Sequence, residues 1–313
     1  MFGEHCTRTI VRGPTQHCRV PATAEHRPTL AELRPGAELR GVFACTRKDR
    51  LTARTGSPYL ALELRDRTGS VPGRAFREAD FLAAQFEQGD LVEVEGRAER
   101  FRDQLVVDLR SVKRADPGGV DPADFLPVAY RDLDELDGFL EHLGREVYDR
   151  RLRGVLDAFL EDEGFRADLR RVPCTRNGHH AYLGGLLEHT VAVATLALET
   201  SVLHPRLDSD LLICAALLHD IGKTREFTLG AEIALSEEGA LMGHLALGQQ
   251  MLLERGSGVP RERLLALVHC VLGHHGPDNL PGRRFRSPEA MALARLNSLD
   301  AQVKGALEHG LPG

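Results

Sequence analysis

The stretch L-L-I-C-A-A-L-L-H-D-I-G-K at residues 211–223 decides the fold of the C-terminal half of this chain. Its apolar run is too short to span a membrane and predicts a helix buried in a protein core. The run ends at the polar pair His219 and Asp220, and an unpaired buried polar group costs about 1–3 kcal/mol. Metal coordination would remove that cost. Lys223 follows Asp220 by one helical turn, so its ammonium would lie beside the metal and could donate to a phosphate oxygen.

Other candidate ligands are also polar side chains on or beside apolar helical segments. They are His189, His244, the pair His274 and His275, and Asp300. Imidazole and carboxylate together suit Mn, Fe, Zn or Ni better than Ca or Mg. A single histidine is weak evidence for a metal, but H-D-x-G-K with these further residues in order is strong evidence. The sequence therefore predicts a metal site in a helical domain.

These motifs resemble the HD superfamily of metal-dependent phosphohydrolases, and the full histidine set resembles its two-metal members. The matching segments are G-G-L-L-E-H at 184–189, L-L-H-D-I-G-K at 217–223 and L-N-S-L-D at 296–300. The resemblance implies two divalent ions, with Mn²⁺ expected and Fe, Ni, Zn and Mg as alternatives. It implies one ion on His189, His219, Asp220 and Asp300, and a second on Asp220, His244, His274 and His275. Asp220, as the bridge, and Lys223, as a phosphate contact, are the expected catalytic residues.

Residues 28–114 predict a small β domain. The alternation in Y-L-A-L-E-L-R at 59–65 has the period of a strand, and D-R-T-G-S at 66–70 signals a turn. Strands are expected at 39–45, 59–65, 71–76, 91–98 and 105–109, with a helix at 78–88. This order is that of an OB-fold, which often binds single-stranded nucleic acid or oligosaccharide. The expected fold class is a small all-β OB-fold barrel followed by an all-α HD-type metal-dependent phosphohydrolase domain.

Single-strand binding needs a basic groove with aromatic side chains on which bases stack. Tyr59 and Phe101, expected at strand ends, are the candidate stacking residues, whereas Phe43 and Phe76 are expected in the barrel core. The formal net charge of −6 argues against strong non-specific binding to duplexes. It neither supports nor excludes single-stranded RNA or DNA as a partner.

An OB-fold followed by an HD domain resembles the YhaM-type 3′→5′ exoribonucleases of bacteria, over roughly residues 28–308. The stretch H-H-A-Y-L-G-G-L-L-E-H-T at 179–190 is similar to theirs. The resemblance implies manganese-dependent hydrolysis of single-stranded RNA, and of single-stranded DNA, to nucleoside 5′-monophosphates. His180 would either touch the scissile phosphate or structure its loop. Two alternatives stay open: an HD phosphohydrolase of nucleotides or cyclic dinucleotides with a regulatory OB-fold, and a non-catalytic single-strand binding protein.

The expected organisation is a flexible N-terminal extension at 1–27, the OB-fold at 28–114, a linker at 115–130 and the HD domain at 131–313. No apolar signal region opens the chain, and no apolar run reaches the ~18 residues of a membrane span. Six cysteines are spread without a C-x-x-C pair, so a reducing, cytoplasmic location without membrane contact is expected. A homo-oligomer is compatible with the sequence.

Overall fold

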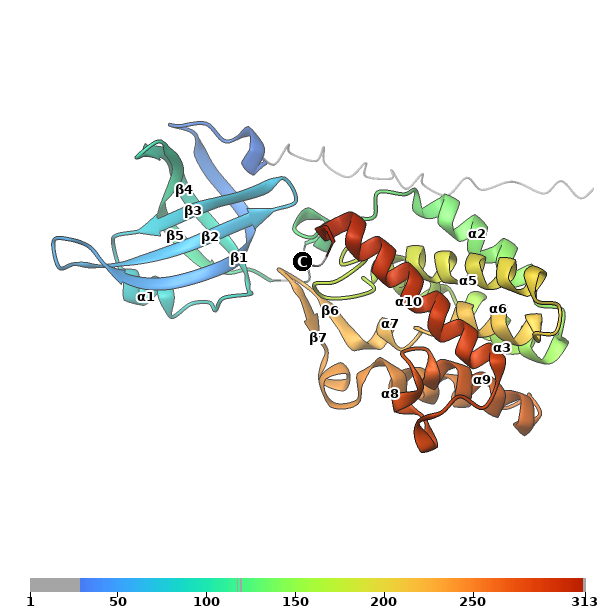
Figure 1. The fold of residues 1–313 in the computed structure, drawn as a ribbon. Helices are drawn as coiled ribbons and strands as arrows, with labels where there is room; N and C mark the ends of the chain where they lie inside the picture. Colours follow the sequence, from blue (N-terminus) through green and yellow to red (C-terminus); the bar gives the residue numbers. More distant parts are fainter. Residues whose placement is uncertain (1–28, 117, 119, 312–313) are drawn as a thin grey trace, which may run out of the picture.

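The computed structural model describes residues 29–116, 118 and 120–311, which form a β barrel and a helical domain (Figure 1). The expected extension at 1–27 lies outside these residues. The arrangement confirms the expected fold class. The helical domain also holds a short hairpin, β6 (Phe227–Leu229) and β7 (Ile233–Leu235), which turns near Gly230.

Five strands close the barrel in the order β1-β2-β3-β5-β4, with β3 and β5 parallel and the other neighbours antiparallel. The strands are β1 (Glu38–Thr52), β2 (Pro58–Asp66), β3 (Gly69–Ala75), β4 (Leu91–Phe101) and β5 (Gln104–Arg114). β1 extends well beyond the expected strand at 39–45, because its first half pairs with β4 and its second half with β2. The expected helix at 78–88 is shorter and comprises only α1 (Ala79–Ala83).

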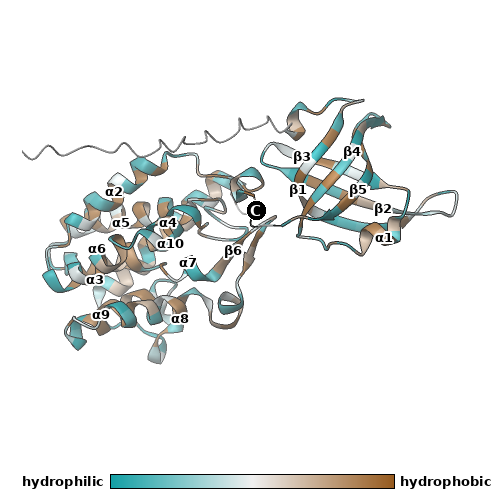
Figure 2. Cartoon of the chain, turned by 180° about the vertical axis from the view of Figure 1, so that it is seen from behind, coloured by the Kyte–Doolittle hydropathy of each residue, from teal (hydrophilic) through white to brown (hydrophobic). Residues whose placement is uncertain are grey.

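Apolar side chains fill the barrel, because buried and exposed residues alternate along its strands. Leu60, Leu62 and Leu64 of β2 are at most 4 % exposed, and Figure 2 shows hydrophilic and hydrophobic residues alternating along the strands. Phe43 lies in this core as expected. Phe76 does not, because it lies just past the end of β3. It is 55 % exposed and stacks on Tyr59 with ring centroids 5.1 Å apart.

Two apolar helices form the centre of the helical domain, α5 (Gly185–Leu203) and α6 (Ser209–Leu218). The run at 211–218 is buried throughout, as expected, and the Asp208 carboxylate caps α6 by accepting from Leu211 N. The surrounding helices are α2 (Leu133–Arg145), α3 (Arg150–Leu160), α4 (Glu163–Arg171), α7 (Lys223–Glu226), α8 (Glu237–Arg255), α9 (Arg261–Gly273) and α10 (Pro288–His309).

Helix α5 is long and apolar enough to cross a membrane by length and composition, contrary to the expectation that no segment would be. Half of that apolar window is buried inside the domain, where α5 packs against α2, α4, α6 and α10. A core helix of a soluble domain passes the same test. The packing explains its apolar character without a membrane.

The barrel touches the helical domain through the linker and the β6–β7 hairpin. The Arg65 guanidinium donates to Ala231 O at 2.8 Å, and Arg67 N donates to Asp124 O at 2.8 Å. A small buried apolar cluster joins the barrel, the linker and the hairpin tip through Ala44, Leu91, Phe125 and Ala231. The linker is therefore partly packed, with Phe125 and Leu126 each 2 % exposed.

Gly222 lets α7 lie directly against α8. A Cβ at this position would come within 2.0 Å of His244 O and 2.6 Å of Gly248 N. Both neighbours are backbone atoms and cannot rotate away. Glycine is therefore required between Asp220 and Lys223 by packing, at a φ of −61° that any residue could adopt.

We predict that Gly222→Ala lowers the free energy of unfolding by about 2 kcal/mol or more, since overpacking typically costs 1–3 kcal/mol. Chemical denaturation would measure the change. Gly154→Ala is the matched control, because a Cβ at this exposed position in α3 meets nothing within 4 Å. The control should gain up to ~1 kcal/mol of helix propensity. Equal stability of the two variants would contradict the packing argument.

Candidate metal centre

Asp220 is the hub of the candidate centre. It follows α6 and is 2 % exposed, and ligand-type side chains from α5, α8, α9 and α10 surround it. Its carboxylate, with His244, His274 and His275, offers donor atoms that all lie within 4.8 Å of one another. The structure thus brings together residues that are far apart in the sequence.

Hydrogen bonds place the protons on the first pair of histidines. His189 Nδ1 lies 2.6 Å from Asp300 Oδ2, and His219 Nδ1 lies 2.8 Å from Ala216 O. Both partners are acceptors, so each Nδ1 carries the hydrogen and each Nε2 of a neutral ring presents a lone pair. The two Nε2 atoms are 3.1 Å apart, at 3.6 and 3.3 Å from Asp220 Oδ2.

The second group follows the same rule around the other oxygen of Asp220. His274 Nδ1 donates to Val271 O at 2.6 Å, and its Nε2 lies 3.2 Å from Asp220 Oδ1. His244 Nε2 lies 3.8 Å from this oxygen and 2.9 Å from His275 Nε2. Neither Asp220 Oδ1 nor His274 Nε2 has a hydrogen-bond donor among the described residues. Buried acceptors facing one another fit a bound cation, which would supply the missing positive charge.

Burial keeps these groups in the state that metals require. It lowers the pKa of His274 to about 4, and desolvation of the ring lowers that of the partly solvent-exposed His275 to about 3, so both rings are neutral near pH 7. Burial alone would raise the pKa of Asp220, but the Lys223 ammonium beside it holds the pKa well below its usual value. The carboxylate is therefore ionised.

Lys223 makes its hydrogen bond to Asp220, and the contact of its ammonium with a phosphate stays a prediction. Its side chain is 6 % exposed, and Nζ donates to Asp220 Oδ2 at 2.6 Å and lies 3.4 Å from Cys174 Sγ. The ammonium thus stabilises the negative charge of Asp220. Cys174, which the sequence analysis did not single out, is fully buried, and burial raises the pKa of its thiol to about 12.

His180 is part of the structure around the centre. It is 1 % exposed, and its two nitrogens face Tyr182 Oη at 2.9 Å and Asp300 Oδ2 at 3.1 Å. Its φ of 51° also shapes the turn before α5. These contacts favour the loop-structuring role over the phosphate contact. His179 is the less buried member of the pair, and its ring centroid lies 5.2 Å from that of His189.

Glu226 is a supporting residue that the sequence did not reveal. Its Oε1 accepts from His244 N at 2.9 Å and from His244 Nδ1 at 3.0 Å. Gly243, with φ 69° and ψ 161°, kinks α8 so that His244 can turn toward the carboxylate. Glu226 and His244 lie on either side of a hairpin, and the spacing between them does not predict a contact. Their pairing is visible only in the folded structure.

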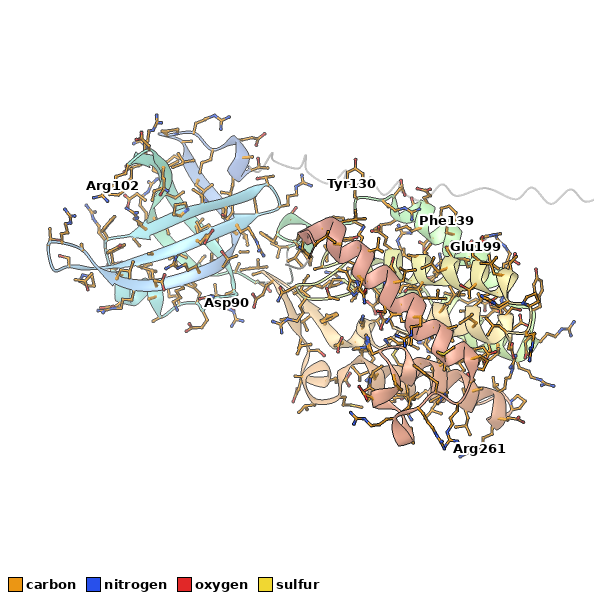
Figure 3. The ribbon with its side chains drawn as sticks, viewed as in Figure 1. Asp90, Arg102, Tyr130, Phe139, Glu199 and Arg261 are labelled. Carbon is orange, nitrogen blue, oxygen red and sulfur yellow. The ribbon has the colours of Figure 1, made fainter. Side chains whose placement is uncertain are left out.

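The candidate stacking residues lie on the barrel. Phe101 is 46 % exposed, with the Arg74 guanidinium 4.5 Å and the Arg102 guanidinium 5.4 Å from its ring centroid. Tyr59 lines a groove of about 700 Å³ together with Arg47, Arg74 and Gln104. Arg102 lies at the end of the barrel that faces away from the helical domain (Figure 3).

Comparison with known proteins assigns both domains. Residues 186–302 match the HD domain model, and residues 44–114 match the model of the OB-fold nucleic acid binding domain. The barrel resembles, at a TM-score of 0.24 and 20 % identity, the second OB-fold domain of replication protein A from Methanococcus maripaludis, covering 28 % of this chain and 94 % of that one. The class is thus an HD domain, a metal-dependent hydrolase fold, joined to an OB-fold of the nucleic-acid-binding kind.

Relatives that match most of the chain give a more specific class of protein. The chain is 27 % identical over 290 residues to the 3′-5′ exoribonuclease YhaM of Oceanobacillus iheyensis, covering 89 % of each protein. It is 26 % identical to that of Listeria innocua, covering 84 % of this chain and 85 % of the relative. The resemblance to the YhaM-type family, inferred from the motifs, is confirmed over most of the chain.

We predict that Glu226→Gln weakens binding of a divalent ion at His244 by about 10–100-fold, the usual range for a residue that orients a metal ligand. The amide can still accept from one N–H but carries no charge to hold the His244 tautomer. Metal analysis after dialysis against graded Mn²⁺ measures the loss. Glu237→Gln, an exposed change on α8, the helix that carries His244, is the control. Parental binding by Glu226→Gln would remove this residue from the centre.

Proposed function

We propose that this protein is a metal-dependent 3′→5′ exonuclease that hydrolyses single-stranded RNA, and single-stranded DNA, to nucleoside 5′-monophosphates in the cytoplasm. One observation carries the proposal: imidazole lone pairs converge on both oxygens of Asp220 in a chain that also holds a nucleic-acid-binding barrel. The convergence supports phosphoester hydrolysis, and the barrel supports a polynucleotide substrate. The names of the relatives support RNA and the 3′ end.

In this proposal Asp220 bridges two metal positions. His189 and His219 face its Oδ2, while His244, His274 and His275 surround its Oδ1. Divalent ions bound there, for which we propose Mn²⁺, would activate water and neutralise charge on the phosphoryl group. The chain contributes fixed ring orientations, a buried carboxylate and the Lys223 ammonium, all in place before substrate arrives.

The barrel would hold the strand at a distance from the metal centre. Tyr59 lies near the outer end of β2, and Arg67, just beyond the other end, contacts the linker residue Asp124. From Tyr59 to Asp66, the last residue of β2, seven residues of β-strand span about 23 Å at 3.3 Å per residue. A nucleic-acid strand stacked on Tyr59 must therefore run along the barrel before it reaches the helical domain. Short oligonucleotides cannot cover that distance.

The first test uses the full chain with Mn²⁺ and 5′-labelled single-stranded RNA and DNA. We expect a ladder that shortens from the 3′ end, release of nucleoside monophosphates, and inhibition by a 3′-phosphate but not by a 5′-phosphate. Asp220→Asn should abolish the ladder. Equal cutting of circular and linear strands would contradict the exonuclease proposal. Hydrolysis of nucleotides or cyclic dinucleotides alone would identify a small-molecule phosphohydrolase instead.

The second test concerns the barrel. The double variant Tyr59→Ala/Phe101→Ala should raise KM for long strands by about 30-fold or more, since each of the two lost stacking contacts costs about 1–3 kcal/mol. Hydrolysis of bis-p-nitrophenyl phosphate should stay at the parental rate. Phe81→Ala removes another exposed phenylalanine, 65 % exposed on α1, and is the control. If KM for long strands stays at the parental value, the strand does not lie on these rings.

A further inference from the structure

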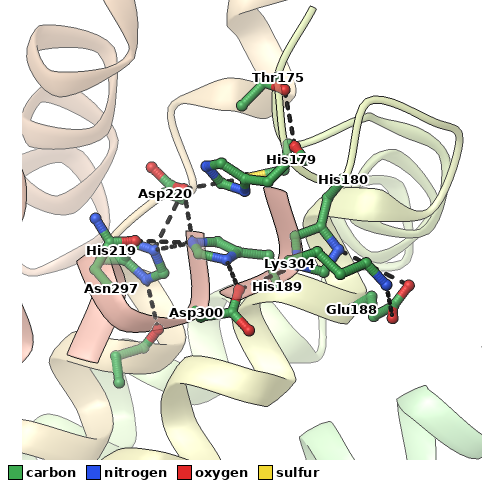
Figure 4. Close-up of polar contacts among 12 residues, drawn as sticks. Thr175, His179, His180, Glu188, His189, His219, Asp220, Asn297, Asp300 and Lys304 are labelled. Atoms are coloured by element: carbon green, nitrogen blue, oxygen red, sulfur yellow. Dashed lines mark hydrogen bonds and ion pairs between the residues drawn. The ribbon is translucent and has the colours of Figure 1, made fainter. Parts of the chain in front are cut away.

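Two side chains of α10, Asn297 and Asp300, meet the same histidine at different nitrogens. Asp300 Oδ2 lies 2.6 Å from His189 Nδ1, whereas Asn297 Oδ1 lies 2.9 Å from His189 Nε2. Asn297 is 6 % exposed. Figure 4 shows Asn297 with His219 and Asp220 around one part of the His189 ring and Asp300 near its other nitrogen.

The orientation of the Asn297 amide follows from its second contact. Its Nδ2 donates to the backbone carbonyl of His274 at 3.2 Å, and a carbonyl can only accept. The amide oxygen is therefore the atom that faces His189. Because His189 carries its hydrogen on Nδ1, its Nε2 presents a lone pair to this oxygen at 2.9 Å.

Four acceptors thus meet without a hydrogen between them. They are His189 Nε2, His219 Nε2, Asp220 Oδ2 and Asn297 Oδ1. Among the described residues, Lys223 donates a hydrogen bond to the carboxylate of this group and to none of the other three atoms. Such an arrangement is repulsive unless a cation lies among the lone pairs. Imidazole, carboxylate and amide oxygen are all established kinds of metal donor.

We infer that Asn297 Oδ1 is the fourth protein ligand of the first metal position, and that Asp300 is a positioning residue outside it. Asp300 Oδ2 already faces N–H groups of His189 and His180, at 2.6 and 3.1 Å. It holds the His189 tautomer and ring orientation, as a carboxylate behind a metal-bound histidine does. The first position then carries one negative charge fewer than a set containing Asp300. This inference deepens the proposed two-metal function and rests on it.

The test measures metal binding without any nucleic acid, so a failed nuclease assay would not affect it. Full-length variants are titrated with Mn²⁺ and the free ion is followed by electron paramagnetic resonance. Asn297→Ala should weaken one of two sites by more than about 100-fold, beyond the range for supporting residues. Asp300→Asn keeps an acceptor for His189 Nδ1 and should cost about 10–100-fold, the range for a supporting residue. Ser298→Ala, on the same helix turn, is the control and should bind as the parent does.

The variant Asn297→Asp distinguishes a metal-ligand role of Asn297 from a purely structural role of its amide. A carboxylate in place of the amide oxygen should bind the first ion at least as tightly as the parent, although it loses the hydrogen bond to His274 O. This variant also decides the matter if Asn297→Ala melts at a much lower temperature by circular dichroism. Two ions bound at parental affinity in Asn297→Ala would overturn the inference. Loss of one ion in both Asp300→Asn and Asn297→Asp would overturn it too, and would return the ligand role to Asp300.

Discussion

Placement of protons on Nδ1 is the constraint on which the candidate centre depends. His219 and His274 each donate to the carbonyl three residues earlier, Ala216 O and Val271 O, at the ends of α6 and α9. The last turn of a helix leaves such carbonyls without a partner in the helix. The same contact therefore completes the helix end and presents the Nε2 lone pair to Asp220. For His189 and His244 the acceptors are instead the carboxylates of Asp300 and Glu226.

The fold brings these helix ends to one point. The apolar run at 211–218 holds α6 in the core. Gly222, which follows α6, allows α8 to approach closely. The barrel is a separate closed unit with its own core. In the proposed function, binding and hydrolysis lie in different domains, which pack against each other at the small cluster of Ala44, Leu91, Phe125 and Ala231.

Sequence patterns predicted what depends on local periodicity. The alternation in β2 and the apolar run before His219 indicated both domains, and H-D-x-G-K indicated the centre. Spacing could not decide between Asn297 and Asp300, because residues three apart share a helix face, and only packing shows which nitrogen of His189 each one meets. The exposure of Phe76 depends on where β3 ends, and the pairing of Glu226 with His244 depends on a hairpin that folds back. Both outcomes depend on the tertiary structure rather than on local sequence patterns.

The β6–β7 hairpin has a mechanical consequence. It leaves the centre directly after Glu226, and its tip at Ala231 is fastened to Arg65 of the barrel. Any rocking of the barrel must either break that fastening or drag the hairpin along. In the second case the displacement would move the Glu226 carboxylate that orients His244. Motion of the barrel would then change the geometry of the candidate metal centre.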